Sequence, residues 1–284
     1  MFDYSGRLYT FGCSMTRYHY PTWADILGKE FSYYENWGRG GHGNLFIFNS
    51  VIECLARNQL TSNDTIIVMW SAISRYDYYK INEWCIENDT LRLPKQFVCP
   101  YGNEVRDYAY FYALYNLLES KHINFKFLAW HPYAKDSVAG NIYKSVLDKI
   151  SIVNFDKLNK RIIEKPILKL ELLYNRLAGS EWPSLQELLD KKINSYPLKI
   201  KQEVEEFYSI INKNRYEYVE EKESDAVDLH PGPLQHLTGL QTIFPTVALS
   251  KTTIDWIADI DHKVQNKLPY NFNEFAKATP KERF

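Results

Sequence analysis

Residues 65–70 read TIIVMW, and this apolar stretch gives the clearest indication of the fold class. An unbroken run rich in β-branched and large apolar side chains is typical of a strand that is buried on both faces. Residues 8–12 (LYTFG) and 124–130 (NFKFLAW) predict two further strands, and residues 31–37 and 150–155 predict two more. The chain therefore contains several short strands suited to the centre of a parallel sheet.

Helical patterns separate these strands. Residues 22–27 begin after Pro21, and apolar side chains then recur at helical spacing from Leu45 to Leu55 and from Val105 to Tyr115. Strands that alternate with helices predict an α/β fold, here a three-layer α/β/α arrangement with a mostly parallel sheet. In such sheets functional groups gather at the carboxyl ends of the strands. The residues just past those predicted ends are Ser14, Gly41, Ser71 and His131.

The character of the chain changes between residues 156 and 223. This block is rich in Lys and Glu, and it predicts amphipathic helices, one of them from Pro166 to Gly179. We expect residues 1–155 and 224–284 to form the α/β domain and residues 156–223 to form a helical insertion. Such an insertion could be a lid, a surface for self-association or a solvated appendage.

The composition of the chain indicates which partners and which cellular location to expect. The formal net charge of −1 gives no general attraction to nucleic acid or to an anionic membrane. The four cysteines show no CxxC pair, which favours a reducing compartment. No signal-peptide pattern opens the chain, and its apolar runs are shorter than the ~20 residues of a membrane span. We therefore expect a soluble, cytoplasmic protein without a nucleic-acid or membrane partner.

Residues 11–14, FGCS, place a serine directly after the first predicted strand. A serine on such a turn is held by the sheet with its hydroxyl in the crevice, and its own N–H can stabilise an oxyanion. Ser14 is thus a candidate nucleophile. The alternative is an ordinary turn or N-cap serine.

Residues 36–44, NWGRGGHGN, form a glycine-rich turn after the second predicted strand. Clustered glycines allow left-handed backbone and let N–H groups approach a ligand closely. The spacing does not fit GxxxxGK[ST], so a Walker-type nucleotide loop is disfavoured. The turn is a candidate oxyanion donor, or else a plain connection between strand and helix.

Residues 225–236, DAVDLHPGPLQH, bring an aspartate and a histidine together near the C-terminus. In an extended segment Asp228 and His230 project to the same side, so the carboxylate can orient the imidazole as a general base. A metal site with Asp228, His230 and His236 is the competing interpretation, but no HExxH motif or Cys/His cluster supports it. We expect no metal and no cofactor, with His236 structural or lining the site.

The order of these three segments resembles that of the SGNH/GDSL hydrolase family. FGCSMT is similar to the family's first block, NWGRGGHGN to its second and the Asp-x-His-Pro segment to its last. The resemblance covers residues 7–240 apart from the insertion. It implies Ser14 as nucleophile and oxyanion donor, Gly41 as a second oxyanion donor, and Asp228 and His230 as the remainder of a catalytic triad.

The chain departs from the family pattern at three places. Cys13 stands where the family name implies aspartate, and Asp-x-His replaces Asp-x-x-His, which leaves Asp225 as an alternative to Asp228. The Gly-x-Asn of the third block is missing, because TIIVMW continues as SAISRYD. Ser71 is the alternative donor there, and Ser74 or Arg75 could also serve.

The resemblance implies hydrolysis of a short-chain acyl or O-acetyl ester, including esters on a carbohydrate. The residues expected to bind such a substrate are Tyr18, His19, Tyr20, Arg75 and His131. An acyltransferase would use the same catalytic residues. The alternative from a different class is a non-catalytic binding or assembly module that keeps the fold.

Overall fold

Five parallel strands form the main sheet of the protein. The structure is a computed structural model, and it describes residues 3–80, 83–88, 99–153, 202, 230–266 and 268–270. The strand order is β2-β1-β3-β6-β7. The strands are β1 (Arg7–Phe11), β2 (Tyr33–Asn36), β3 (Thr65–Trp70), β6 (Asn124–Ala129) and β7 (Ser151–Ile152). The order reverses between β1 and β3, and doubly wound sheets bind their ligands at the carboxyl ends of the strands beside such a switch point.

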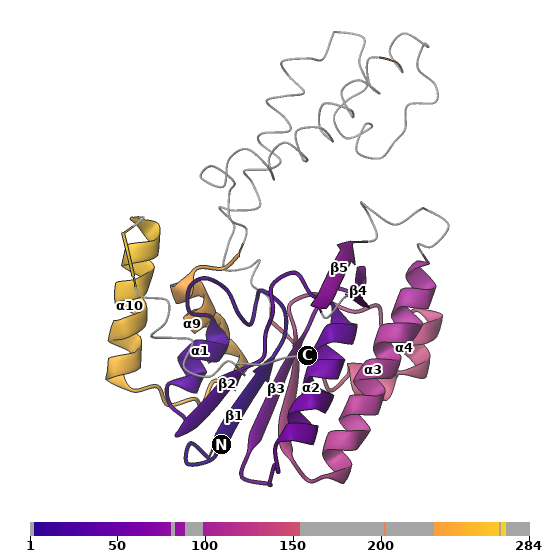
Figure 1. Cartoon of the computed structure of the whole chain (residues 1–284), viewed down its shortest axis with the longest axis horizontal. Coiled ribbons are helices and arrows are strands. Elements are labelled where there is room, and N and C mark those ends of the chain that lie inside the picture. The colour runs from indigo at the N-terminus through magenta and orange to yellow at the C-terminus, as the bar shows by residue number, and fades with distance from the viewer. Residues whose placement is uncertain are drawn as a thin grey trace. The chain divides into compact units, whose positions relative to one another are not determined.

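Helices cover both faces of this sheet (Figure 1). One layer holds α1 (Trp23–Gly28) and α9 (Pro233–Ile243), with α10 (Lys251–Gln265) packed on α9. The opposite layer holds α2 (Asn44–Arg57) and α3 (Pro100–Ser120), with α4 (Val138–Ile142) and α5 (Lys144–Leu147) beside α3. The predicted three-layer α/β fold with a parallel sheet is confirmed.

The alternation of side chains along the strands explains this layering. On β3, Ile66, Val68 and Trp70 belong to the core shared with α2 and α3, whereas Ile67 and Met69 are buried outside that core cluster. The Trp70 ring lies 4.4 Å from that of Phe111 on α3. Each buried large side chain contributes about 1.5–3 kcal/mol by leaving water. A strand that is apolar from Ile66 to Trp70 therefore stabilises both helical layers.

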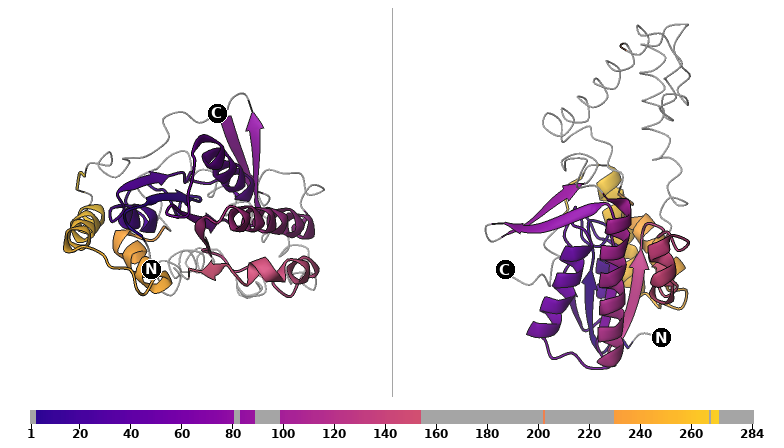
Figure 2. Two further views of the ribbon diagram at one scale, coloured as in Figure 1. Left: turned by 90° about the horizontal axis from the view of Figure 1, so that it is seen from below. Right: turned by 90° about the vertical axis from the view of Figure 1, so that its right-hand side faces the viewer.

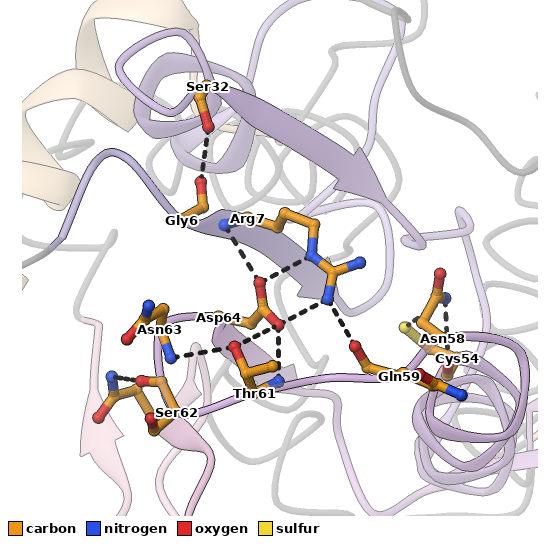
Figure 3. Close-up of polar contacts among 11 residues, drawn as sticks. Gly6, Arg7, Ser32, Cys54, Asn58, Gln59, Thr61, Ser62, Asn63 and Asp64 are labelled. Carbon is orange, nitrogen blue, oxygen red and sulfur yellow. Dashed lines mark hydrogen bonds and ion pairs between the residues drawn. The ribbon is translucent and has the colours of Figure 1, made fainter.

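An ion pair joins the starts of β1 and β3 (Figure 3). The Arg7 guanidinium donates to both oxygens of Asp64, at 2.8 and 2.7 Å, and to the Gln59 carbonyl at 2.7 Å. The N–H of Thr61 donates to the same carboxylate at 2.7 Å. These contacts fix the amino ends of the two central strands, opposite to the edge at which the candidate site lies.

A two-stranded antiparallel hairpin beside α2 is a feature that the sequence does not predict (Figure 2). It consists of β4 (Arg75–Lys80) and β5 (Glu83–Asn88). Residues 75–80 read RYDYYK, in which Tyr76 and Tyr78 alternate with polar residues, but the buried position is Asp77 while Tyr78 is exposed. The predicted strand at 150–155 is correct in position but shorter, because β7 covers only Ser151–Ile152.

The chain divides into two compact units. One contains Met1–Phe155 with His230–Phe284, and the other contains Asp156–Leu229. The predicted helical insertion, including Pro166 to Gly179, lies outside the described residues except for Gln202. In the part of the chain that is described, no helix has both the length and the apolar character needed to cross a membrane.

Candidate functional site

Ser14 lies on a tight turn directly after β1. The N–H groups of Thr16 and Arg17 both donate to the Cys13 carbonyl, at 3.0 and 3.1 Å. Cys13 is fully buried, and Ser14 retains 7% of its surface. Within the described residues neither the hydroxyl nor the N–H of Ser14 has a hydrogen-bond partner. The turn therefore leaves both groups of Ser14 available to a ligand.

Gly12 permits this turn because the backbone comes very close to its neighbours there. A Cβ at Gly12 would clash with the Thr16 side chain and lie 3.0 Å from the Met69 carbonyl oxygen on β3. Any larger residue would push the turn away from β3. Glycine at this position thus keeps Ser14 against the centre of the sheet, at the switch point between β1 and β3.

A buried polar network centred on Asp25 supports the turn that carries Ser14. The Asp25 carboxylate accepts from the Thr22 N–H at 2.9 Å and from the Tyr34 hydroxyl and the Asn36 amide, both at 3.0 Å. The Asn36 amide also donates to the Thr16 carbonyl at 2.9 Å. Burial raises the pKa of Asp25. Fully satisfied networks of this kind rigidify the segment that they support.

The glycine-rich turn after β2 lies beside Ser14. The N–H of Arg39 donates to the Gly12 carbonyl at 3.0 Å, which anchors this turn to the end of β1. A Cβ built on Gly40 would lie 3.9 Å from the Ser14 Cβ. Gly41 has a φ of 80°, in the left-handed region that favours glycine. The two segments that were predicted to supply oxyanion donors are therefore neighbours.

His230 contacts the loop that follows Ser14. Its ring stacks on that of Tyr18, with 4.0 Å between centroids and 23° between planes. The Tyr20 hydroxyl donates to the His230 carbonyl at 3.3 Å, although the two residues lie 210 positions apart. Tyr20 is buried, whereas His19 is exposed. The fold thus places the loop that follows Ser14, the predicted nucleophile, in contact with His230, the predicted base.

The two candidate acids, Asp225 and Asp228, lie outside the described residues. His236 is fully buried on α9, and this burial, together with the nearby His230, lowers its pKa. Among the described residues, no three His, Cys, Asp or Glu side chains are grouped so that they could hold a metal ion.

Ser71 and the other predicted residues past β3 and β6 are engaged within the protein. The Ser71 side chain is fully buried, and its N–H donates to the Asn44 side chain at 2.7 Å. Arg75 donates to the His42 carbonyl at 3.0 Å and lies over the Trp130 ring. His131 is exposed, with its ring nitrogen 2.8 Å from the Pro132 carbonyl oxygen.

Asn44 is a supporting residue that sequence reasoning missed, although it ends the quoted glycine motif. Its amide nitrogen donates to the Ser71 carbonyl at 3.0 Å and to Asp107 at 2.6 Å. Burial raises the pKa of Asp107 to about 6, although the ion pair with Arg106 favours the charged form. Asp77, also missed, caps the start of α2 by accepting from the N–H groups of Gly43 and Phe46.

Replacing Asn44 with alanine should destabilise the protein by about 3 kcal/mol, because it leaves the buried Ser71 N–H without its acceptor and removes one donor each from the Ser71 carbonyl and from Asp107. Urea unfolding measures the change. Asn49→Ala on the same helix is the matched control, because the Asn49 amide donates only to the Leu45 carbonyl, within its own helix. Equal losses in the two variants would contradict the proposed role of Asn44.

Stability should fall as the pH is lowered because of His236. Burial lowers its pKa from 6.5 to about 3, so the unfolded chain binds the proton more tightly than the folded one. The neutral His236 ring therefore favours the folded state fully above pH 6.5, and this contribution is lost as the pH falls toward 3. The free energy of unfolding should decrease by roughly 3–5 kcal/mol over that range. Asp107 has the opposite sign, because its raised pKa favours the folded state below pH 6.

A comparison with the His236→Gln variant separates these two effects. The free energy of unfolding is measured at about pH 4 and about pH 7 for both proteins, within the window in which histidine titrates. We expect the wild type to lose more stability than the variant on acidification. A variant that loses as much as the wild type would show that His236 is not the group responsible.

The described architecture defines an α/β three-layer protein with its candidate site at the carboxyl end of β1. No protein family matches the sequence, and no curated protein matches it. Among solved structures, the chain is similar to a member of the lipolytic protein G-D-S-L family from Veillonella parvula. The two are 12% identical over 58% of this chain and 84% of the other, with a TM-score of 0.32. At that score the likeness adds nothing to the topology and contacts described above.

Proposed function

We propose that the protein is a serine esterase that cleaves a short-chain acyl or O-acetyl ester through an acyl-enzyme on Ser14. One observation carries the proposal: the loop that follows Ser14 packs on His230, with Tyr18 stacked on the imidazole ring. This contact supports a site at the switch point of the sheet in which the proposed nucleophile and the proposed base, from opposite ends of the chain, would act together.

The reaction would begin with proton transfer from the Ser14 hydroxyl to His230 as the serine oxygen attacks the acyl carbonyl. The N–H groups of Ser14 and Gly41 would stabilise the oxyanion that forms. His230 would then return the proton to the departing alcohol. Water, activated by the same imidazole, would release the acid and restore Ser14. Asp228 is the proposed partner that orients His230.

The oxyanion hole would hold two donors rather than three. The Ser71 N–H donates to Asn44, so it is not directed at a substrate. Loss of one donor from such a hole lowers turnover by about 100- to 1,000-fold. We therefore expect a slow esterase, or one with a narrow choice of substrate. Tyr18 and His19 would line the acyl or alcohol side of the site.

The test of this function is turnover of p-nitrophenyl acetate by the purified protein, together with covalent labelling by a fluorophosphonate probe. We expect both in the wild type and neither in Ser14→Ala. A wild-type protein that neither turns over the ester nor reacts with the probe would instead support a non-catalytic module.

A further inference from the structure

An open pocket of about 410 Å³ lies between the loop after Ser14 and the glycine-rich turn. Its lining residues are Arg17, Tyr18, His19, Gly38, Arg39 and Gly40. These residues come from two segments that flank Ser14, and Gly40 is the one whose added Cβ would reach toward the Ser14 Cβ. The pocket is therefore next to the proposed nucleophile.

The charged side chains that line this pocket are all positive. Two arginines and a histidine line it, and its described lining contains no Asp or Glu. Across the described residues, neither Arg17 nor Arg39 forms an ion pair or a side-chain hydrogen bond. By contrast, Arg7, Arg57 and Arg106 each pair with a carboxylate. The two cations of the pocket are thus available to an anion from outside.

Close contacts anchor the main chain of both arginines near Ser14. A Cβ at Gly38 would lie 2.9 Å from the Arg17 Cβ, so the two segments touch at the base of the pocket. The N–H of Arg17 donates to Cys13 and that of Arg39 to Gly12, the residues that precede Ser14. The main chain of both arginines is therefore anchored to the turn that carries Ser14, which keeps the start of each side chain near the proposed nucleophile.

We propose that the substrate is an anionic ester, whose carboxylate or phosphate group binds between Arg17 and Arg39 while its acyl bond lies at Ser14. Guanidinium groups bind such oxyanions through paired, charge-assisted hydrogen bonds. The exposed His19 ring, held 4.1 Å from that of Tyr18, offers a surface on which a flat ring or a sugar can pack. The ester part of this inference rests on the proposed function, whereas the anion site does not depend on it.

A pair of substrates that differ only in charge tests the preference. The kcat/KM for para-acetoxybenzoate is compared with that for its methyl ester, which lacks the carboxylate charge. We expect the wild type to prefer the anion, and Arg17→Gln or Arg39→Gln to lower the ratio of the two values by about tenfold, as expected for one charged hydrogen bond. Arg57→Gln removes the same charge at the far end of α2 and should leave the ratio unchanged.

Direct binding tests the anion site without any chemistry. Calorimetry of para-hydroxybenzoate and of inorganic phosphate with Ser14→Ala shows whether a carboxylate or a phosphate is preferred. Binding that weakens about tenfold when Arg17→Gln or Arg39→Gln is added supports the site. If neither anion binds, or if binding survives both substitutions, the anion proposal is wrong. Failure of both esters to react, with anion binding intact, would overturn only the esterase function.

Discussion

Ser14→Ala should lower the turnover of p-nitrophenyl acetate by about 10⁴-fold or more, since removal of a serine nucleophile costs up to about 10⁶-fold in a well-built triad. The expected loss is large because the alcohol oxygen forms the acyl-enzyme, and the other nucleophilic side chains at the turn, those of Cys13 and Thr16, are fully buried. Steady-state kinetics on the purified variant measure the effect.

The fold should tolerate this substitution. The Ser14 hydroxyl has no hydrogen-bond partner within the described residues, so alanine leaves no described group unsatisfied. We expect an unchanged melting temperature, which separates loss of chemistry from loss of structure. Ser120→Ala is the control, because Ser120 is exposed at the end of α3 and bonds only the Leu117 carbonyl. If Ser14→Ala turns over the ester at the wild-type rate, Ser14 is not the nucleophile.

His230→Ala should lower turnover by about 10³- to 10⁴-fold, near the upper end of what a positioned general base supplies. Without the imidazole, the serine hydroxyl has no acceptor for its proton at the moment of attack. The Tyr18 ring that stacks on His230 would border the space left by the substitution. Added imidazole should enter that space and restore part of the activity.

This rescue distinguishes a base from a packing residue. A merely structural loss would lower activity without any response to imidazole. His262→Ala removes an exposed histidine on α10 and should keep the wild-type rate. If imidazole does not raise the rate of His230→Ala, while the variant melts at the wild-type temperature, His230 is not the base.

The fold could be predicted because the apolar composition of its central strands indicates that they are buried. Residues 65–70 are apolar at nearly every position, and β3 begins and ends at those residues. The β4–β5 hairpin was not predicted, because the position that RYDYYK buries is the polar Asp77, while Tyr78 is exposed. It is instead held at β4 by long-range contacts, such as those from Asp77 to the start of α2.

For the site, the sequence predicted three segments, and the structure shows how the described parts of them are supported. The motif around Gly41 and the segment at His230 were found because glycine and Asp-x-His-Pro patterns have local meaning. Asp25, Asn44 and Asp107 were missed because their roles depend on partners far away in the sequence. The roles of Ser14 and His230 remain predictions, and Asp228 lies outside the described residues.

The most direct test of the central claim is to map where a fluorophosphonate probe reacts. The labelled wild-type protein is digested, and mass spectrometry identifies the peptide and the residue that carry the phosphonyl group. We predict a single adduct on Ser14, absent from Ser14→Ala and slowed in His230→Ala. An adduct on any other serine, or no adduct on a folded protein that still hydrolyses the ester, would contradict the assignment of Ser14 as nucleophile.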